Sequence, residues 1–541
     1  MSRQVSRRKF LAAAAALAAA NSAVQAHDGR RGPSFEHGVA SGDPLHDRVI
    51  IWTRVTTPHW YDDVEVKWQV ARDPKMRRVV ATGRSSANIW RDFTVKVDVD
   101  RLDPAHTYYY QFSTQGERSP VGRTRTLARG QVDAARLAVV SCSNLPAGLF
   151  NVYALIAQRA DLDAVLHLGD YLYEYANATY GDGALLDRVP LPDKEIVTLS
   201  DYRQRHAQYK RDADLQAAHR QHPFICVWDD HEITNDAWKD GAENHNPELG
   251  EGEYSVRKRA AIRAYFEWMP IREWAHRPNA RIFRQFHFGE LADLMMLDTR
   301  HYGRDQQSPV PPLSPSAGFP ANDPVINDPG RTLLGFDQEA WLQERLYQSQ
   351  SHGTTWRLLG QQIMMAQLSV SGGRTLFNLD QWDGYRPARQ RLFDGIRDNG
   401  VSNVVVLTGD IHTSWANELT GNPWDPAVYN PATGAGVVGV EFVTPGVSSP
   451  GILNPVEAAQ TAAFLRSVSP HMKFAELNRR GYVLLDIDHE RVQGEFWHVA
   501  TVDSVSREET LAAAFVDEAG ANRLQLASAA TPMRAAADPA S

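Results

Sequence analysis

Four apolar segments of this chain end in side chains that can ligate metals or transfer protons. The stretch "VWDDHEITNDAW", residues 227–238, follows the apolar run "PFIC" directly and places two adjacent acids before a histidine. The other three segments are "RLAVVSCSN", "DAVLHLGDYLYEY" and "VVVLTGDIHTSW", and the candidate groups at the four ends are Cys142, Asp170, Tyr173, Asp230, His231, Asp410 and His412. Adjacent carboxylates repel one another unless a cation or a proton compensates them. The pattern therefore predicts bound cations.

The elements that must position these groups are strands of an open α/β sheet. In such sheets the carboxyl ends of neighbouring strands meet at one crevice, so ligands that are dispersed in the sequence converge in space. A thiolate and a phenolate favour a high-valent transition metal, whereas carboxylates suit a hard ion such as Ca²⁺. A mixed site for iron and calcium is the expectation from the donor types.

Two kinds of pattern divide the chain. Residues 35–128 contain β-branched and aromatic runs separated by turn residues, which predicts a small all-β domain, residues 27–130, that resembles a fibronectin/Ig-like sandwich. Residues 131–505 alternate strand-like and helical segments, which predicts an α/β domain with mixed sheets and flanking helices. The Pro- and Gly-rich residues 308–330 are expected to form a long loop, and residues 506–541 an Ala-rich, loosely attached tail.

The N-terminal 26 residues are typical of a twin-arginine export signal. They contain a basic start with Arg7 and Arg8, an Ala/Leu run and small residues spaced for cleavage. Their removal takes away four basic residues and no acid, so the formal charge shifts from −8 to −12. An acidic chain of this kind argues against a nucleic-acid-binding role. No stretch reaches about 18 uninterrupted apolar residues, so no transmembrane segment is expected.

The two cysteines, Cys142 and Cys226, allow one disulfide in an oxidising compartment, and this alternative stays open at this point. Cys226 lies within an apolar run and is expected in the core.

Eight motifs taken in order resemble the PhoD-type alkaline phosphatases, within the wider purple-acid-phosphatase-like metallophosphoesterases. They are "FEHGVASGDP", "VIIWTR", "SCSN", "HLGDYLYEY", "WDDHEITNDAW", "LDTR", "LTGDIHTSW" and "EFVTPGVSSP", and they extend over about residues 35–497. The resemblance implies an α/β metallophosphoesterase domain behind a β-sandwich, with Fe³⁺ and Ca²⁺ as cofactors.

The resemblance also implies roles for individual residues on the iron side. Asp170 resembles the bridging carboxylate, Tyr173 the phenolate on Fe³⁺, and His412 the imidazole on iron. Cys142 stands where purple enzymes use an aspartate.

On the calcium side, Asp410 and Asp230 stand where purple enzymes place neutral ligands, and this replacement implies calcium rather than zinc. His231 is implied near the scissile bond, where it steadies the phosphoryl group or protonates the leaving oxygen. Asn235 either completes a calcium site or contacts phosphate.

Arg300, in "LDTR", follows another strand end, and two interpretations of its role are open. It either clamps phosphate oxygens bidentately or only pairs with Asp298.

The predicted function is that of an exported alkaline phosphatase, periplasmic or secreted through the twin-arginine machinery, that releases inorganic phosphate from small mono- and diesters. A phospholipase D-like phosphodiesterase, acting on phospholipid or nucleotide diesters, is the alternative within the same chemistry. A non-catalytic, metal-stabilised cell-surface binding protein is the alternative from another class.

Overall fold

The N-terminal domain is a sandwich of β-strands, as the sequence predicted. The computed structural model describes residues 32–58, 61–273, 281–314 and 318–540. The strands of one face are β3 (Val64–Ala71), β4 (Val79–Ala87), β6 (Thr107–Thr114), β7 (Glu117–Arg118) and β8 (Gly122–Arg125), and those of the other are β1 (Val39–Gly42), β2 (Val49–Arg54) and β5 (Thr94–Val99). Alternate side chains such as Val66, Tyr110 and Phe112 fill a separate core between them.

The sandwich shares a sheet with the catalytic domain. β1 pairs in parallel with β11 (Pro223–Cys226), which joins the two domains through Ser41 and Gly42. The resulting ten-stranded sheet has the order β24-β23-β22-β21-β9-β10-β11-β1-β2-β5. Its further members are β9 (Ala134–Val140), β10 (Ala164–His167), β21 (Gly481–Asp488), β22 (Arg491–Val499), β23 (Glu509–Glu518) and β24 (Leu524–Leu526).

A seven-stranded sheet packs face to face on this one. Its order is β12-β13-β15-β17-β19-β18-β20, with bounds β12 (Arg284–Phe288), β13 (Ala292–Met296), β15 (Trp356–Gly360), β17 (Val404–Thr408), β18 (Ser414–Thr420), β19 (Val437–Val443) and β20 (Met472–Glu476). In β17, Val405 and Leu407 enter the core between the sheets, whereas Val404 and Val406 enter the core under the helices. Burial on both faces explains why this strand reads as a continuous apolar run.

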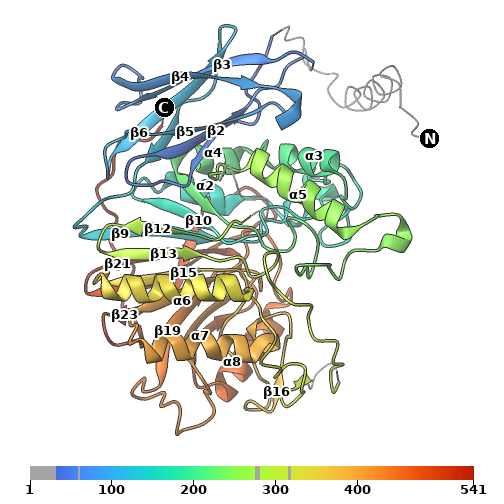
Figure 1. The fold of residues 1–541 in the computed structure, drawn as a ribbon, viewed down its shortest axis with the longest axis vertical. Helices are drawn as coiled ribbons and strands as arrows, with labels where there is room; N and C mark the ends of the chain where they lie inside the picture. The colour runs from blue at the N-terminus through green and yellow to red at the C-terminus, as the bar shows by residue number, and fades with distance from the viewer. Residues whose placement is uncertain (1–31, 59–60, 274–280, 315–317, 541) are drawn as a thin grey trace.

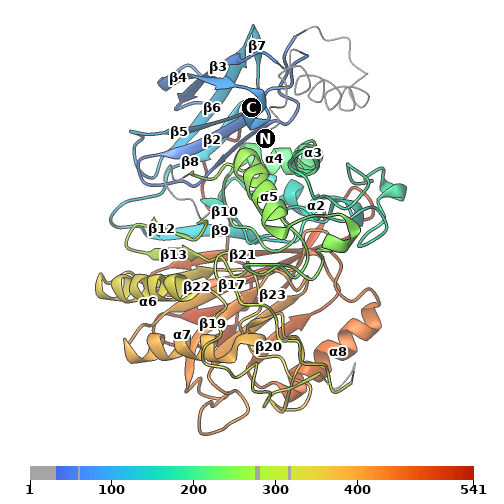
Figure 2. The same cartoon turned by 45° about the vertical axis from the view of Figure 1, so that its right-hand side comes forward.

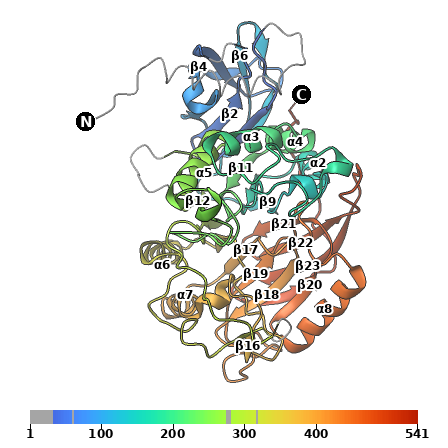
Figure 3. The same ribbon diagram turned by 90° about the vertical axis from the view of Figure 1, so that its right-hand side faces the viewer.

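Helices cover the outer faces of both sheets (Figures 1, 2 and 3). The green helices lie between the sandwich and the first sheet, and the yellow and orange helices α6 and α7 run side by side against the second. The bounds are α2 (Asn151–Gln158), α3 (Leu199–Tyr209), α4 (Ala213–Gln221), α5 (Tyr254–Trp268), α6 (Phe336–Ser351), α7 (Arg386–Asp398) and α8 (Pro455–Val468). Short 3₁₀ turns are η1 (Ile89–Arg91), η2 (Leu145–Ala147), η3 (Ala184–Leu186), η4 (Pro247–Leu249) and η5 (Trp382–Tyr385). Within the described ranges, none of the helices has the length and apolar character that a bilayer span requires.

Local sequence explains where these helices begin. α3 starts with a capping box, in which Thr198 accepts from the amide of Asp201 and the Asp201 carboxylate accepts in return from the amide of Thr198. The side chain of Asp212 accepts from two amides at the start of α4, and Asn454 does the same for α8.

The expectation of a loosely attached tail at residues 506–541 was wrong. β23 and β24 extend the ten-stranded sheet, and the chain after them returns to the sandwich. There the hydroxyl of Tyr109 donates to the carbonyl of Asp538 at 2.6 Å, and Ala540 pairs with Gln221. The described parts of residues 308–330 are mostly loop, with one short strand, β14 (Phe319–Pro320), paired to β16 (Thr375–Leu376).

Candidate metal centre and active site

The chain turns sharply where the predicted ligands leave their strands. Cys142, Asp170, Asp410 and His412 all have positive φ angles, between 53° and 61°. Non-glycine residues rarely adopt this left-handed conformation, which costs on the order of 1–3 kcal/mol each. Strain of this kind at four ligand positions shows that the fold holds these side chains in place against their local preference.

The first group of ligands contains the thiol. Donor atoms of Cys142, Asp170 and His412 lie within 4.8 Å of one another. The Tyr173 hydroxyl donates to Oδ2 of Asp170 at 3.0 Å and lies 3.2 Å from Nε2 of His412. Ser449 also donates to the Tyr173 oxygen, at 2.7 Å. The structure therefore brings together the four residues predicted for iron.

Two acid-rich groups continue from the first. Asp170, Asp230 and His231 form one, and Asp229, Asp230 and Asp410 form the other, again with donor atoms within 4.8 Å. Because Asp170 and Asp230 each belong to two groups, the three groups form one continuous cluster.

Arg300 lies among these acids. Its guanidinium contacts Asp229 at 2.5 Å, Asp380 at 2.7 Å and Asp410 at 2.6 Å, and Asp230 at 3.7 Å. The alternative in which Arg300 only pairs with Asp298 is wrong, since Asp298 accepts merely from the Arg300 backbone amide. Arg300 is fully buried, so its charge is the principal compensation that the chain itself provides.

The chemistry of this cluster fits bound cations. Four carboxylates, those of Asp229, Asp230, Asp380 and Asp410, contact Arg300, and a fifth, that of Asp170, lies beside Asp230. The buried oxygens Oδ1 of Asp170 and Oδ2 of Asp229 have no hydrogen-bond partner among the described residues. Buried carboxylate oxygens without partners are costly, and a cation would satisfy them.

Proton affinities in the cluster agree with this interpretation. Burial, with further acids nearby, raises the pKa of Asp229 well above its ordinary value and that of Asp410 to about 6. Burial and then the charge of Asp170 raise the pKa values of Cys142 and Tyr173 well above their ordinary values. A cation that binds the thiolate and the phenolate must displace both protons.

His231 is paired with a buried carboxylate. Its Nδ1 lies 2.7 Å from Oε2 of Glu174, which is completely buried. Burial opposes the charged imidazolium, but the charges of Glu174, Asp170 and Asp230 outweigh burial and raise the pKa of His231 well above its ordinary value. Glu174 thus holds His231 in one orientation beside the cluster and favours its protonated form.

Several residues that the sequence reasoning missed hold the cluster together. Glu232 accepts from the backbone amides of Asp170, Tyr171 and Asp229, and so ties two ligand loops to each other. Gln381 donates to Oδ2 of Asp410 at 2.7 Å. The only sequence signals for the missed residues are acids inside the quoted motifs and the polar stretch "NLDQWDGY", which carries Asp380 and Gln381.

The other predicted residues have mixed outcomes. The Asn235 side chain donates to Glu243 at 3.2 Å and its backbone amide to Glu174, so its role as a ligand or phosphate contact stays a prediction. Both cysteines are free and buried, which excludes the disulfide. Cys226 lies in the core as expected.

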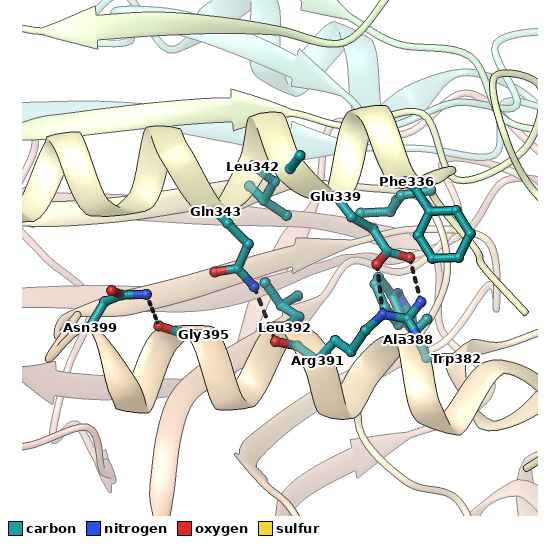
Figure 4. A pocket seen from close by; sticks show the side chains of 12 residues that line it. Phe336, Glu339, Leu342, Gln343, Trp382, Ala388, Arg391, Leu392, Gly395 and Asn399 are labelled. Carbon is teal, nitrogen blue, oxygen red and sulfur yellow. Dashed lines mark hydrogen bonds and ion pairs between the residues drawn. The ribbon is translucent and has the colours of Figure 1, made fainter. Parts of the chain in front are cut away.

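A cavity of about 420 Å³ lies between α6 and α7, away from the cluster (Figure 4). Its lining is mostly apolar, and its principal charged groups, Glu339 and Arg391, pair with each other. None of the cluster's acids lines it, so this cavity is separate from the candidate metal centre.

Known proteins resemble this chain over nearly its whole length. The family model described as "PhoD-like phosphatase" matches residues 137–496, and that described as "PhoD-like phosphatase, N-terminal domain" matches residues 19–128. Alkaline phosphatase D of Bacillus subtilis (strain 168) is 36% identical over 501 residues, which cover 88% of this chain and 81% of the relative. A solved structure described as "Structure of PhoD" superposes with a TM-score of 0.82 at 34% identity, over 93% of this chain and 94% of the other.

Proposed function

Because the chain belongs to the PhoD-like phosphatase family and is a phosphoric ester hydrolase, we propose that it is an exported alkaline phosphatase that releases inorganic phosphate from both monoesters and diesters. The single observation that supports this proposal best is the continuous cluster of three ligand groups, in which Asp170 and Asp230 are each shared. Two-metal phosphatases use cations a few ångströms apart, which such shared carboxylates would provide.

We assign the ligands to two kinds of cation by their chemistry. Cys142, Tyr173, His412 and Asp170 would hold Fe³⁺, because a thiolate and a phenolate are anionic donors suited to a high-valent transition metal. The acids around Asp230 would hold Ca²⁺, which prefers oxygen ligands. When bound, such ions supply Lewis acidity that acidifies water and neutralises a phosphate group.

The chain's own residues supply proton transfer and positioning. His231, oriented by Glu174, is placed to donate a proton to the leaving oxygen. Arg300 keeps the acids of the cluster in register through its three short contacts, which use three of its five N–H donors. Arg300 remains our candidate for a phosphate contact through its other N–H groups. Asn235 remains our candidate for a further calcium or phosphate contact.

Export is part of the proposal. Residues 1–26, the predicted twin-arginine signal, lie outside the described residues. We assign the sandwich to residues 27–130 and the catalytic domain to residues 131–505, to which strands β23 and β24 must be added. A periplasmic or secreted location follows from the signal, and replacing Arg7 and Arg8 by lysine should retain the protein in the cytoplasm.

The substrate range can be tested with p-nitrophenyl phosphate and bis-p-nitrophenyl phosphate. We expect turnover of both by the metal-replete protein. Turnover of the diester alone would favour the phospholipase D-like alternative, and would contradict the monoesterase part of the proposal. His231→Ala should lose turnover while the protein stays folded, with a lowered melting temperature because the buried Glu174 loses its partner.

A further inference from the structure

Two half-buried tyrosines stand beside the proposed proton donor. The ring centroid of Tyr175 lies 5.5 Å from that of His231, at an interplanar angle of 62°. The ring of Tyr180 is nearly parallel to His231, at 6.4 Å and 11°. The two tyrosine rings are 6.0 Å apart. His231 therefore has an aromatic wall, defined here as Tyr175 and Tyr180, on its accessible side.

The wall differs from the tyrosines that only fill the core. Tyr173, whose ring also lies next to His231, is 2% exposed, and Tyr153, Tyr171 and Tyr209 are fully buried. Tyr175 and Tyr180 instead keep part of their surface accessible. Exposed aromatic surface beside a catalytic group is available to a ligand, whereas the buried rings are not.

The Tyr180 ring is fixed before any ligand arrives. Its hydroxyl lies 2.9 Å from Nδ1 of His412, and its carbonyl accepts from Nδ2 of Asn144 at 2.6 Å. An aromatic ring anchored at both side chain and backbone loses little conformational entropy when a ligand packs on it.

The charged groups that act on Tyr175 and Tyr180 show that the aromatic wall lies beside the acid cluster. Burial and then the charges of Glu174 and Asp230 raise the pKa of Tyr175, and burial and then Cys142 and Asp170 raise that of Tyr180. Both phenols thus lie close to the acids that would hold the phosphate-binding cations. A phosphate held there would direct its leaving group past His231 and along the wall.

We propose that Tyr175 and Tyr180 bind the leaving group, and that the enzyme prefers phosphate esters whose leaving group carries a planar aromatic ring. The inference rests on the proposed phosphatase function and specifies its substrate class. Both nucleobases and aryl groups offer such a ring. Aromatic pairs contribute about 0.5–1.5 kcal/mol beyond area burial, which corresponds to a preference of about 2- to 10-fold in kcat/KM.

The test uses the metal-replete full chain and two matched substrate pairs. Adenosine 5′-monophosphate and ribose 5-phosphate differ by a nucleobase and release the same type of primary hydroxyl. Benzyl phosphate and cyclohexylmethyl phosphate differ mainly in the planarity of the ring. We expect kcat/KM to be about 2- to 10-fold higher for the aromatic member of at least one pair. The pair that shows this preference tells whether the aromatic wall binds a nucleobase or an aryl group.

Variants then assign the preference to the wall. Tyr175→Leu should bring the ratio within the responsive pair close to one, while Tyr175→Phe should keep it. Tyr347→Leu, which removes an exposed tyrosine from α6, should leave both rates unchanged. Inhibition by the free leaving groups is a measurement that needs no variant. If the nucleobase pair shows the preference, free adenosine should inhibit ribose 5-phosphate hydrolysis more strongly than free ribose does. If the ring pair shows it, benzyl alcohol should inhibit more strongly than cyclohexylmethanol does.

The two failures are distinguishable. Equal kcat/KM values within both pairs, or a ratio that Tyr175→Leu does not change, would overturn the inference and leave the phosphatase function intact. No hydrolysis of any of the four esters would overturn the proposed function, and the inference with it.

Discussion

Replacement of the buried Lys210 by methionine should stabilise the protein, and should do so more at pH 7 than at pH 10. Lys210 caps the end of α3 and is 2% exposed. Its Nζ lies 2.9 Å from Nε2 of His219 and over the rings of Trp52 and Tyr171. No carboxylate pairs with it among the described residues. Burial lowers the pKa of Lys210 from 10.5 to about 7, and the nearby Cys226 thiol, whose own pKa burial raises to about 12, only partly opposes this.

The magnitude and its pH window follow from this lowered pKa. Between pH 7 and 10.5 the unfolded chain binds the proton more tightly than the folded one, so stability rises with pH. Below pH 7 both states are protonated and the full penalty remains. At about 1.4 kcal/mol per tenfold change, a pKa lowered from 10.5 to about 7 corresponds to a penalty of about 5 kcal/mol.

Methionine removes this penalty at limited cost. The Tyr171 hydroxyl still reaches Nε2 of His219 at 2.9 Å, so no acceptor is left unpaired. The lost cation–π contacts amount to about 2 kcal/mol. Lys210→Met should therefore be more stable by about 2–4 kcal/mol at pH 7, and by little or nothing at pH 10.5.

Thermal unfolding of the metal-replete protein, followed by circular dichroism at pH 7 and pH 10, measures this difference. Lys194→Met, which removes an exposed lysine, is the matched control and should change little at either pH. A Lys210→Met protein that is less stable than wild type at pH 7, or that differs from it equally at both pH values, would refute the reasoning.

Three further outcomes follow from the same contacts. Glu232→Gln should weaken Ca²⁺ binding, measured by calorimetry, about 10- to 100-fold, because the ligand loops lose a shared acceptor; unchanged affinity would contradict this. Glu174→Gln should lower kcat/KM for alkyl phosphates about tenfold more than it lowers kcat/KM for p-nitrophenyl phosphate. The reason is that proton donation by His231, which Glu174 orients, contributes most when the leaving group is poor. An equal loss for both substrates would show that Glu174 does not act through the proton donor. Asp486→Asn should lower the free energy of unfolding by about 1–3 kcal/mol, because it removes one of the two carboxylates that pair with the buried Arg136 and leaves only Asp161, yet it should leave metal content unchanged. Altered metal content would indicate that the cluster depends on this distant pair.

The ligands that could be predicted from the sequence are those that follow a buried strand directly. Cys142 and Asp410 each come two residues after the end of a strand, β9 in the ten-stranded sheet and β17 in the seven-stranded sheet, and the packing of the two sheets places them in one cluster. The alternation of apolar strand-like runs with helical segments is visible in the sequence. The α/β domain, and the strand ends that carry the site, could therefore be predicted from it.

Residues on long loops were not predictable in the same way. Asp380 lies twenty residues beyond the end of β15, in a stretch with no periodicity, and tertiary contacts with Arg300, Arg304 and Gln307 bring it to the cluster. The C-terminal strand β23 was mistaken for a tail because its Ala-rich sequence has low β propensity. Pairing with β22 along its length overrides that preference.

The most direct test of the account is to measure metal content and p-nitrophenyl phosphate turnover in the same preparations. Elemental analysis of active protein should find iron and calcium, turnover should be lost as a chelator removes calcium, and added Ca²⁺ should restore it. Replacement of Cys142 by serine should remove iron without unfolding the protein. Full turnover in protein that contains neither metal would contradict the assignment of the three ligand groups, which extend from Cys142 to Asp410, as the catalytic centre.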